Sequence, residues 1–160
     1  MPLDILILRD PRESVRKCSL TPVHRAELDD VRFVRFHPDK TIDGGGRVLL
    51  DPEGEEITEQ DRGFGLVLID CCWRRLPRLR QSLVGEVRPR RLPPLVTAYP
   101  RRSFKFDDPD AGLASIEALY AATVLLGEPR PELLTGYHFA EEFLRLNAVL
   151  TRPTRAESQI

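Results

Sequence analysis

The segment Leu66–Asp70 constrains the fold of this chain more than any other. It consists of four apolar residues in a row, LVLI, followed by an acid. An unbroken apolar run of this length is typical of a strand that is buried on both faces, as in the middle of a parallel sheet. Because parallel sheets bind ligands at the carboxyl ends of their strands, Asp70 is a candidate for chemistry.

Other segments complete an α/β pattern. Short apolar or β-branched runs predict further strands at residues 3–8, 31–36 and 47–50, whereas 51–54 (DPEG) has the composition of a turn. Helices are predicted after Pro22, capped by Ser19 or Thr21, then over residues 115–126, and once or twice within 131–150. We therefore expect an α/β domain over residues 1–92, a mostly helical domain over 93–150 and a flexible tail over 151–160.

Composition indicates an ordinary soluble protein. The chain has 160 residues, of which 41% are hydrophobic, and no apolar run approaches the roughly 20 residues of a membrane span. Its three cysteines are an odd number, which argues against a disulfide framework, and they lack the spacing of metal ligands. We expect a cytoplasmic monomer with no membrane segment and no metal.

Basic residues gather in one segment. Between Arg74 and Arg102 there are nine arginines and no lysine, and Glu86 is the only acidic residue among them. The planar guanidinium group suits phosphate, so this strip predicts contact with RNA or another polyanion. The alternative is a solvated face that pairs with the acidic segment 51–61. The arginines assigned to RNA are Arg74, Arg75, Arg90, Arg91, Arg101 and Arg102.

Five segments, in this order, resemble one known family. They are KCSLTPV (17–23), LIDCCW (68–73), RRLPPLVTAYP (90–100), SIEALYAA (115–122) and FLRLN (143–147). The set resembles the small-subunit rRNA aminocarboxypropyltransferases and covers the chain from about Asp4 to Asn147. The resemblance implies a SPOUT-like fold in which the chain forms a deep trefoil knot. It also implies transfer of the 3-amino-3-carboxypropyl group of S-adenosylmethionine to a modified uridine or pseudouridine of small-subunit rRNA.

The resemblance also implies roles for individual residues. Asp70 takes the proton of the substrate's ring nitrogen, or is instead a structural carboxylate. Trp73 contacts the methionine part of the cofactor, or anchors the core. Ser19 binds the cofactor's carboxylate end, caps a helix, or does both, and Glu117 is a buried hydrogen-bond acceptor. The remaining cofactor-binding assignments are Ile69, Leu92, Leu95, Val96, Tyr99, Ala114 and Ser115.

Two departures from the family pattern keep other functions open. Tyr99 stands where the family has asparagine, and the segment 137–142 (YHFAEE) is acidic at its end where the family has a basic, aromatic run. The alternatives are a methyltransferase and a non-catalytic module that binds RNA or the pre-ribosomal particle on the same fold.

Overall fold

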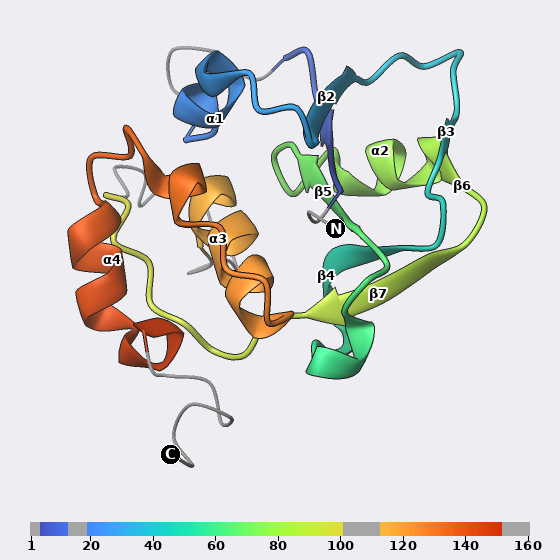
Figure 1. Cartoon of the computed structure of the whole chain (residues 1–160). Helices are drawn as coiled ribbons and strands as arrows, with labels where there is room; N and C mark the ends of the chain where they lie inside the picture. The colour runs from blue at the N-terminus through green and yellow to red at the C-terminus, as the bar shows by residue number, and fades with distance from the viewer. Residues whose placement is uncertain (1–3, 13–18, 101–112, 152–160) are drawn as a thin grey trace.

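A five-stranded parallel sheet forms the centre of the molecule. The computed structural model describes residues 4–12, 19–100 and 113–151. The strand order is β2-β1-β5-β4-β7, and every pairing within the sheet is parallel (Figure 1). The strands are β1 (Ile5–Arg9), β2 (Val31–Arg35), β4 (Arg47–Glu56), β5 (Leu66–Asp70) and β7 (Val87–Arg91). The prediction of a central, doubly covered strand at 66–70 is therefore confirmed.

Helices cover both faces of this sheet. The α-helices are α1 (Thr21–Ala26), α2 (Leu76–Ser82), α3 (Ser115–Leu125) and α4 (Ala140–Leu146). Short 3₁₀ helices are η1 (Glu59–Asp61), η2 (Pro131–Leu134) and η3 (Ala148–Thr151), and a small parallel pair is formed by β3 (Ile42–Asp43) and β6 (Leu83–Val84). Figure 1 shows α3 and α4 together on one side of the molecule, with α2 and the β3–β6 pair on the other. The predicted helical second half is confirmed.

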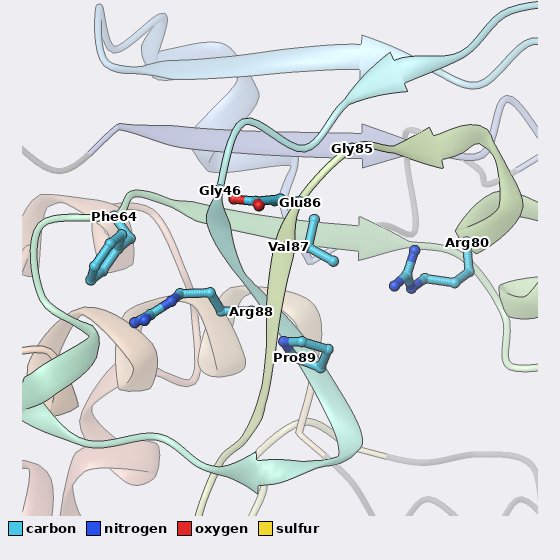
Figure 2. A pocket seen from close by; sticks show the side chains of 8 residues that line it. All are labelled: Gly46, Phe64, Arg80, Gly85, Glu86, Val87, Arg88 and Pro89. Atoms are coloured by element: carbon cyan, nitrogen blue, oxygen red, sulfur yellow. The ribbon is translucent and has the colours of Figure 1, made fainter.

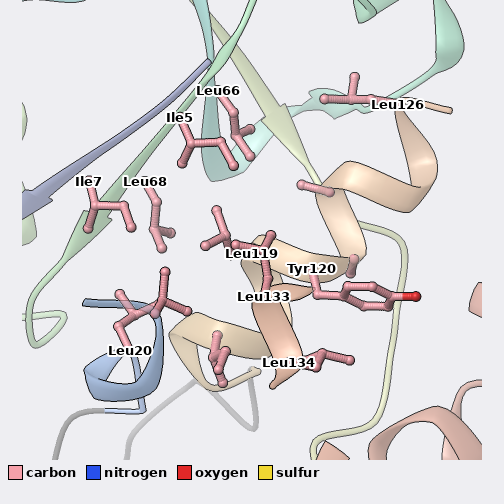
Figure 3. Packing of buried hydrophobic residues seen from close by; sticks show 14 of the residues in the cluster. Ile5, Ile7, Leu20, Leu66, Leu68, Leu119, Tyr120, Leu126, Leu133 and Leu134 are labelled. Carbon is pink, nitrogen blue, oxygen red and sulfur yellow. The ribbon is translucent and has the colours of Figure 1, made fainter. Parts of the chain in front are cut away.

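Side-chain alternation along the strands divides the core into two layers. Ile5, Ile7, Leu66 and Leu68 face α3 and η2 in the largest buried cluster (Figure 3). Their neighbours along the strands point the other way: Leu6 and Val67 pack with Leu83, and Leu8 packs with Leu79. Successive strand residues point to opposite faces. Arg9 ends β1 two residues after Ile7, and Asp70 ends β5 two residues after Leu68, so both side chains lie on the α3 face.

One local prediction was wrong and another holds in part. Neither Ser19 nor Thr21 caps α1, whose N-cap is Leu20 with no side-chain hydrogen bond. The segment 51–54 lies within the bounds of β4 but bulges out of the pairing with β7, because Leu50 and Glu55 both pair with Arg90. Asp51 Oδ1 accepts the Glu53 N–H at 2.9 Å inside this bulge. Gly54 permits this close passage, because a Cβ there would lie 2.5 Å from the backbone of Pro89.

Candidate functional site

The N-terminus of α3 brings together four of the predicted site residues. The Ser115 hydroxyl donates a hydrogen bond to Asp70 Oδ1 at 3.0 Å, which ties the helix to the end of β5. One residue further, the backbone N–H of Ile116 donates to Ser19 Oγ at 3.2 Å. Ser19, which does not cap α1, thus serves the first turn of α3, and predicted residue Ala114 is the N-cap of that helix.

Asp70 is a buried carboxylate between two donors. Only 6% of the residue is exposed, because it ends a strand that is covered by α3. Its register partner on β1 is Arg9, whose Nε lies 3.7 Å from Asp70 Oδ2. One carboxylate oxygen therefore faces a hydroxyl and the other faces a guanidinium. A carboxylate held in this way is both a structural link and a group able to accept a proton.

Glu117, in the first turn of α3, organises the segment that follows β7. Its carboxylate is fully buried and accepts hydrogen bonds from Thr97 Oγ1 (2.6 Å), from the backbone N–H groups of Ala98 and Ala114 (both 2.9 Å) and from the Tyr137 hydroxyl (3.0 Å). Burial and the neighbouring Glu117 carboxylate raise the pKa of Tyr137, which keeps that hydroxyl protonated as a donor. The predicted role of Glu117 as a buried acceptor is confirmed.

Asn147, which follows α4, holds the same segment at a second point. Its Oδ1 accepts from the Val96 N–H at 2.7 Å, and its Nδ2 donates to the carbonyls of Val96 and Phe143 at 2.7 and 2.8 Å. Residues 92–98 have no helix or strand hydrogen bonding of their own. Buried side chains of the helical half therefore fix an extended backbone beside the first turn of α3.

The other predicted cofactor residues lie around this segment or on the opposite face. Leu92, Leu95 and Tyr99 are partly buried and pack against the main core cluster, whereas the Val96 side chain is exposed. Ile69 points to the α2 face, where it packs against the clusters that contain Leu6 and Leu8, so its side chain is directed away from that of Asp70.

Trp73 is not a core anchor. It follows the carboxyl end of β5 in a turn, and 46% of the residue is exposed. The guanidinium of Arg74 lies over its ring, 5.7 Å from the centroid. A large exposed aromatic beside a cation fits a surface that meets a ligand or a nucleic acid better than it fits a packing role.

Several predicted RNA contacts also have partners within the protein. Arg75 donates to the buried Asp10 at 2.7 Å. Burial favours a higher pKa for Asp10, but the hydrogen bonds from Arg75 and from the Arg12 backbone, together with the charges of both arginines, outweigh burial and lower the pKa. Arg90 donates to Asp61 at 3.0 and 3.1 Å, so the alternative of pairing with the acidic segment holds for this arginine. Arg91 donates to the Gly54 carbonyl at 2.9 Å. Arg101 and Arg102 lie outside the described residues.

The described residues contain neither a candidate metal site nor a membrane-spanning helix. Among them, no group of three or more histidine, cysteine, aspartate or glutamate side chains is placed to hold a metal ion. No helix within residues 4–12, 19–100 and 113–151 is long and apolar enough to cross a bilayer. Cys72 is an exposed thiol.

A separate hollow of about 620 Å³ opens beside β7 (Figure 2). The guanidinium of Arg88 lies over the ring of Phe64, 3.9 Å from its centroid, and Arg88 also pairs with Asp61. The lining residues are Gly46, Phe64, Arg80, Gly85, Glu86, Val87, Arg88 and Pro89, none of which is a predicted site residue. This hollow is therefore distinct from the site at α3.

Comparison with known proteins agrees with this geometry. A family model described as "Ribosome biogenesis protein, C-terminal" matches residues 45–159. Two proteins named 16S rRNA aminocarboxypropyltransferase are similar to this chain. The one from Methanopyrus kandleri is 33% identical over 139 residues (82% of this chain and 77% of the relative), and the one from Vulcanisaeta distributa is 30% identical over 144 residues (78% and 76%). The chain belongs to the 16S rRNA aminocarboxypropyltransferase family.

A solved structure supports the same assignment at the level of the fold. It is described as the SAM-dependent rRNA:acp-transferase Tsr3 from Vulcanisaeta distributa. Its TM-score is 0.72 at 28% identity, over 95% of this chain and 83% of the other. The α/β architecture with a parallel sheet is therefore shared with a member of the aminocarboxypropyltransferase family.

The two departures from the family's sequence pattern meet in space. Tyr99 stacks on Tyr137, with ring centroids 6.5 Å apart and an interplanar angle of 9°. Both rings pack edge-on against Phe139, at 6.0 and 5.8 Å. The unusual tyrosine and the unusual segment 137–142 are thus one aromatic cluster, which this aminocarboxypropyltransferase uses to pack the end of its extended segment.

Sequence reasoning missed one residue of the site. Arg9 was not among the predicted site residues, although it stands beside Asp70 on the α3 face. The signal was available in principle, because strand alternation after Ile5 and Ile7 puts residue 9 on the same face. Asn147 was recognised as part of a motif, but its clamp on Val96 was not foreseen.

Proposed function

We propose that this chain transfers the 3-amino-3-carboxypropyl group of S-adenosylmethionine to a modified uridine or pseudouridine of small-subunit rRNA, during ribosome biogenesis. Membership of the family supports the reaction. The observation that carries the proposal in this chain is the contact of Ser115 with Asp70, because it joins the carboxyl edge of the sheet to a helix N-terminus. Such a junction is where parallel sheets bind ligands.

The residues at this junction suit a substrate with an acidic ring N–H. S-adenosylmethionine supplies a sulfonium whose propyl carbon is open to a nucleophile. Asp70 accepts the proton of the ring nitrogen, and the nitrogen lone pair forms the new C–N bond. The C–S bond pair goes to sulfur, so that 5′-methylthioadenosine leaves. Asp70 then releases its proton to water.

Binding of the cofactor is assigned to the surroundings of α3. Ser19 and the first turn of the helix hold the carboxylate end, since free N–H groups and the positive dipole end favour an anion. The extended segment with Leu92, Leu95, Val96 and Tyr99 borders the adenine, with Ala114 and Ser115 beside it. Trp73 lies against the sulfonium as an aromatic face. Ile69 contributes through its backbone, because its side chain points to the opposite face.

Docking of rRNA is assigned to the arginines on either side of the site. Arg74 and Arg91 position phosphates without reading sequence, together with Arg101 and Arg102. Arg75 and Arg90 are held by Asp10 and Asp61, so they support this surface rather than bind phosphate themselves. We further propose that the chain adopts the SPOUT-like trefoil knot. We also propose that it acts as a cytoplasmic monomer without a metal.

Calorimetry separates the enzyme from a non-catalytic RNA-binding module. The enzyme binds S-adenosylmethionine, whereas no detectable heat at millimolar cofactor contradicts the proposal. The variant Asp70→Asn keeps a side-chain oxygen that accepts the Ser115 hydrogen bond, but its amide cannot act as a base. We expect it to lower the transfer rate roughly 100- to 10,000-fold, measured by mass spectrometry of digested rRNA. The control Asp39→Asn alters an exposed turn and keeps full activity. An Asp70→Asn enzyme as fast as wild type removes Asp70 as the base.

A further inference from the structure

Arg9 is the charged residue that ends β1 on the same face as the site. It follows Ile5 and Ile7, which face α3, and it is paired in register with Asp70. Its guanidinium lies over the ring of Phe33, 5.8 Å from the centroid. Strand geometry therefore places a cation beside the proposed base, inside the layer that α3 covers.

The Arg9 guanidinium is buried and only partly satisfied. The side chain is 12% exposed, and its nearest approach to Asp70 Oδ2, through Nε, is 3.7 Å, which is an ion pair rather than a hydrogen bond. Nη2 is buried and has no hydrogen-bond partner among the residues that the structure describes. Buried donors without partners are rare and costly, above all on a charged group, so such an atom calls for a ligand or a water.

We infer that Arg9 binds the carboxylate of the aminocarboxypropyl group of the cofactor, an inference that rests on the proposed function. The transferred group carries a carboxylate, and the adenosine and methyl parts of the cofactor carry no anion. A guanidinium with a free N–H matches a carboxylate better than any other side chain does. The Ser19 hydroxyl stands at the neighbouring helix end, where it accepts from the Ile116 N–H and keeps its own proton to donate, so one carboxylate can meet a charge and a neutral donor together.

This contact makes Arg9 a specificity-determining residue. It makes the protein bind S-adenosylmethionine more tightly than decarboxylated S-adenosylmethionine, which lacks the carboxylate. It also fixes the far end of the group that moves, which helps to hold the propyl carbon in line with the nucleophile. Asp70 keeps its place between Arg9 and Ser115 and remains the proton acceptor.

The test compares two ligands on one protein by calorimetry. The ligands are S-adenosylmethionine and its decarboxylated form. We expect the wild type to prefer S-adenosylmethionine roughly 10- to 100-fold, the range of a hydrogen bond to a charged group. Arg9→Met is expected to abolish most of this preference by weakening only the carboxylated ligand. Arg35→Met changes the exposed register neighbour of Arg9 on β2 and is expected to leave the preference intact.

The ratio of two affinities is insensitive to a partly folded preparation, which lowers both signals equally. If Arg9→Met does not fold, Arg9→Lys is the second variant. It keeps the positive charge but not the pair of parallel N–H donors of the guanidinium, and it is expected to show an intermediate preference. Binding of the cofactor with the same preference in the wild type and in the folded Arg9 variant overturns the inference and leaves the proposed function standing. A wild type that binds neither ligand overturns both.

Discussion

At the residue scale, Glu117 and Tyr137 form the most strongly buried polar pair of the site. Tyr137 is 8% exposed and donates its hydroxyl to Glu117 at 3.0 Å. Burial raises the pKa of Tyr137 above its ordinary value of 10.0, and the Glu117 carboxylate adds to the shift. Above about pH 10 the unfolded chain loses this proton while the folded protein keeps it, so folding stability falls as the pH rises.

This linkage gives a pH prediction. Between pH 10 and 11, the proton that Tyr137 keeps in the folded protein lowers the free energy of unfolding by up to about 1.4 kcal/mol per pH unit. Tyr137→Phe removes that contribution, and the part due to Tyr120, whose pKa is also raised by burial, remains. Urea unfolding at a series of pH values measures the two slopes. Parallel slopes for the wild type and the variant contradict the prediction.

Single residues also show where sequence reasoning was limited. Asp70, Ser115 and Ser19 were predictable because each stands in a motif, and the structure brings the three together at one helix end. Arg9 was not predictable, because a charged residue after an apolar strand usually lies at a solvated strand end. Its burial depends on the coverage by α3, more than a hundred residues later in the chain, which local periodicity does not report.

At the element scale, the extended segment after β7 depends on α4 for its shape. Asn147 makes three hydrogen bonds, two of them to the backbone of Val96, and is 4% exposed. A segment without helix or strand hydrogen bonds keeps one conformation only where side chains satisfy its backbone. The partners that hold this segment come from distant elements, which its own sequence does not report.

Asn147→Ala is therefore expected to loosen this segment and to weaken the cofactor site. It removes the hydrogen bonds of the Asn147 side chain to the part-buried N–H and carbonyl of Val96, which costs about 1–3 kcal/mol of unfolding free energy. The amide of Val96 is expected to exchange with deuterium faster, and the affinity for S-adenosylmethionine to fall. Leu146→Ala, at the half-exposed preceding position, is the matched control. If the Val96 amide exchanges with deuterium no faster in Asn147→Ala than in the wild type, Asn147 does not hold this segment in place.

At the scale of the whole molecule, the sheet and the helical half share one core. The largest buried cluster joins Ile5, Val48 and Leu66 of the strands to Leu119 and Phe143 of α3 and α4. The division into domains at residue 92 remains a prediction from composition. A shared core of this kind favours a single cooperative unfolding transition.

Leu119→Ala tests this shared core. Leu119 is fully buried in α3 against the sheet, so the cavity is expected to cost 2–5 kcal/mol. Fluorescence of Trp73, which follows β5, and the helical circular dichroism signal are expected to shift together to lower urea concentration. Val149→Ala, half-exposed in η3, is expected to change stability by less than about 0.5 kcal/mol. Two separate transitions contradict the single core.

The central claim is that this chain moves the aminocarboxypropyl group, and not the methyl group, onto small-subunit rRNA. The direct measurement incubates the purified chain and unmodified rRNA with S-adenosylmethionine that carries an isotope label in one of the two groups. We expect that label from the aminocarboxypropyl group enters the RNA, that label from the methyl group does not, and that Asp70→Asn greatly reduces the transfer. Methyl label in the RNA, or no transfer of either label by a protein that binds the cofactor, contradicts it.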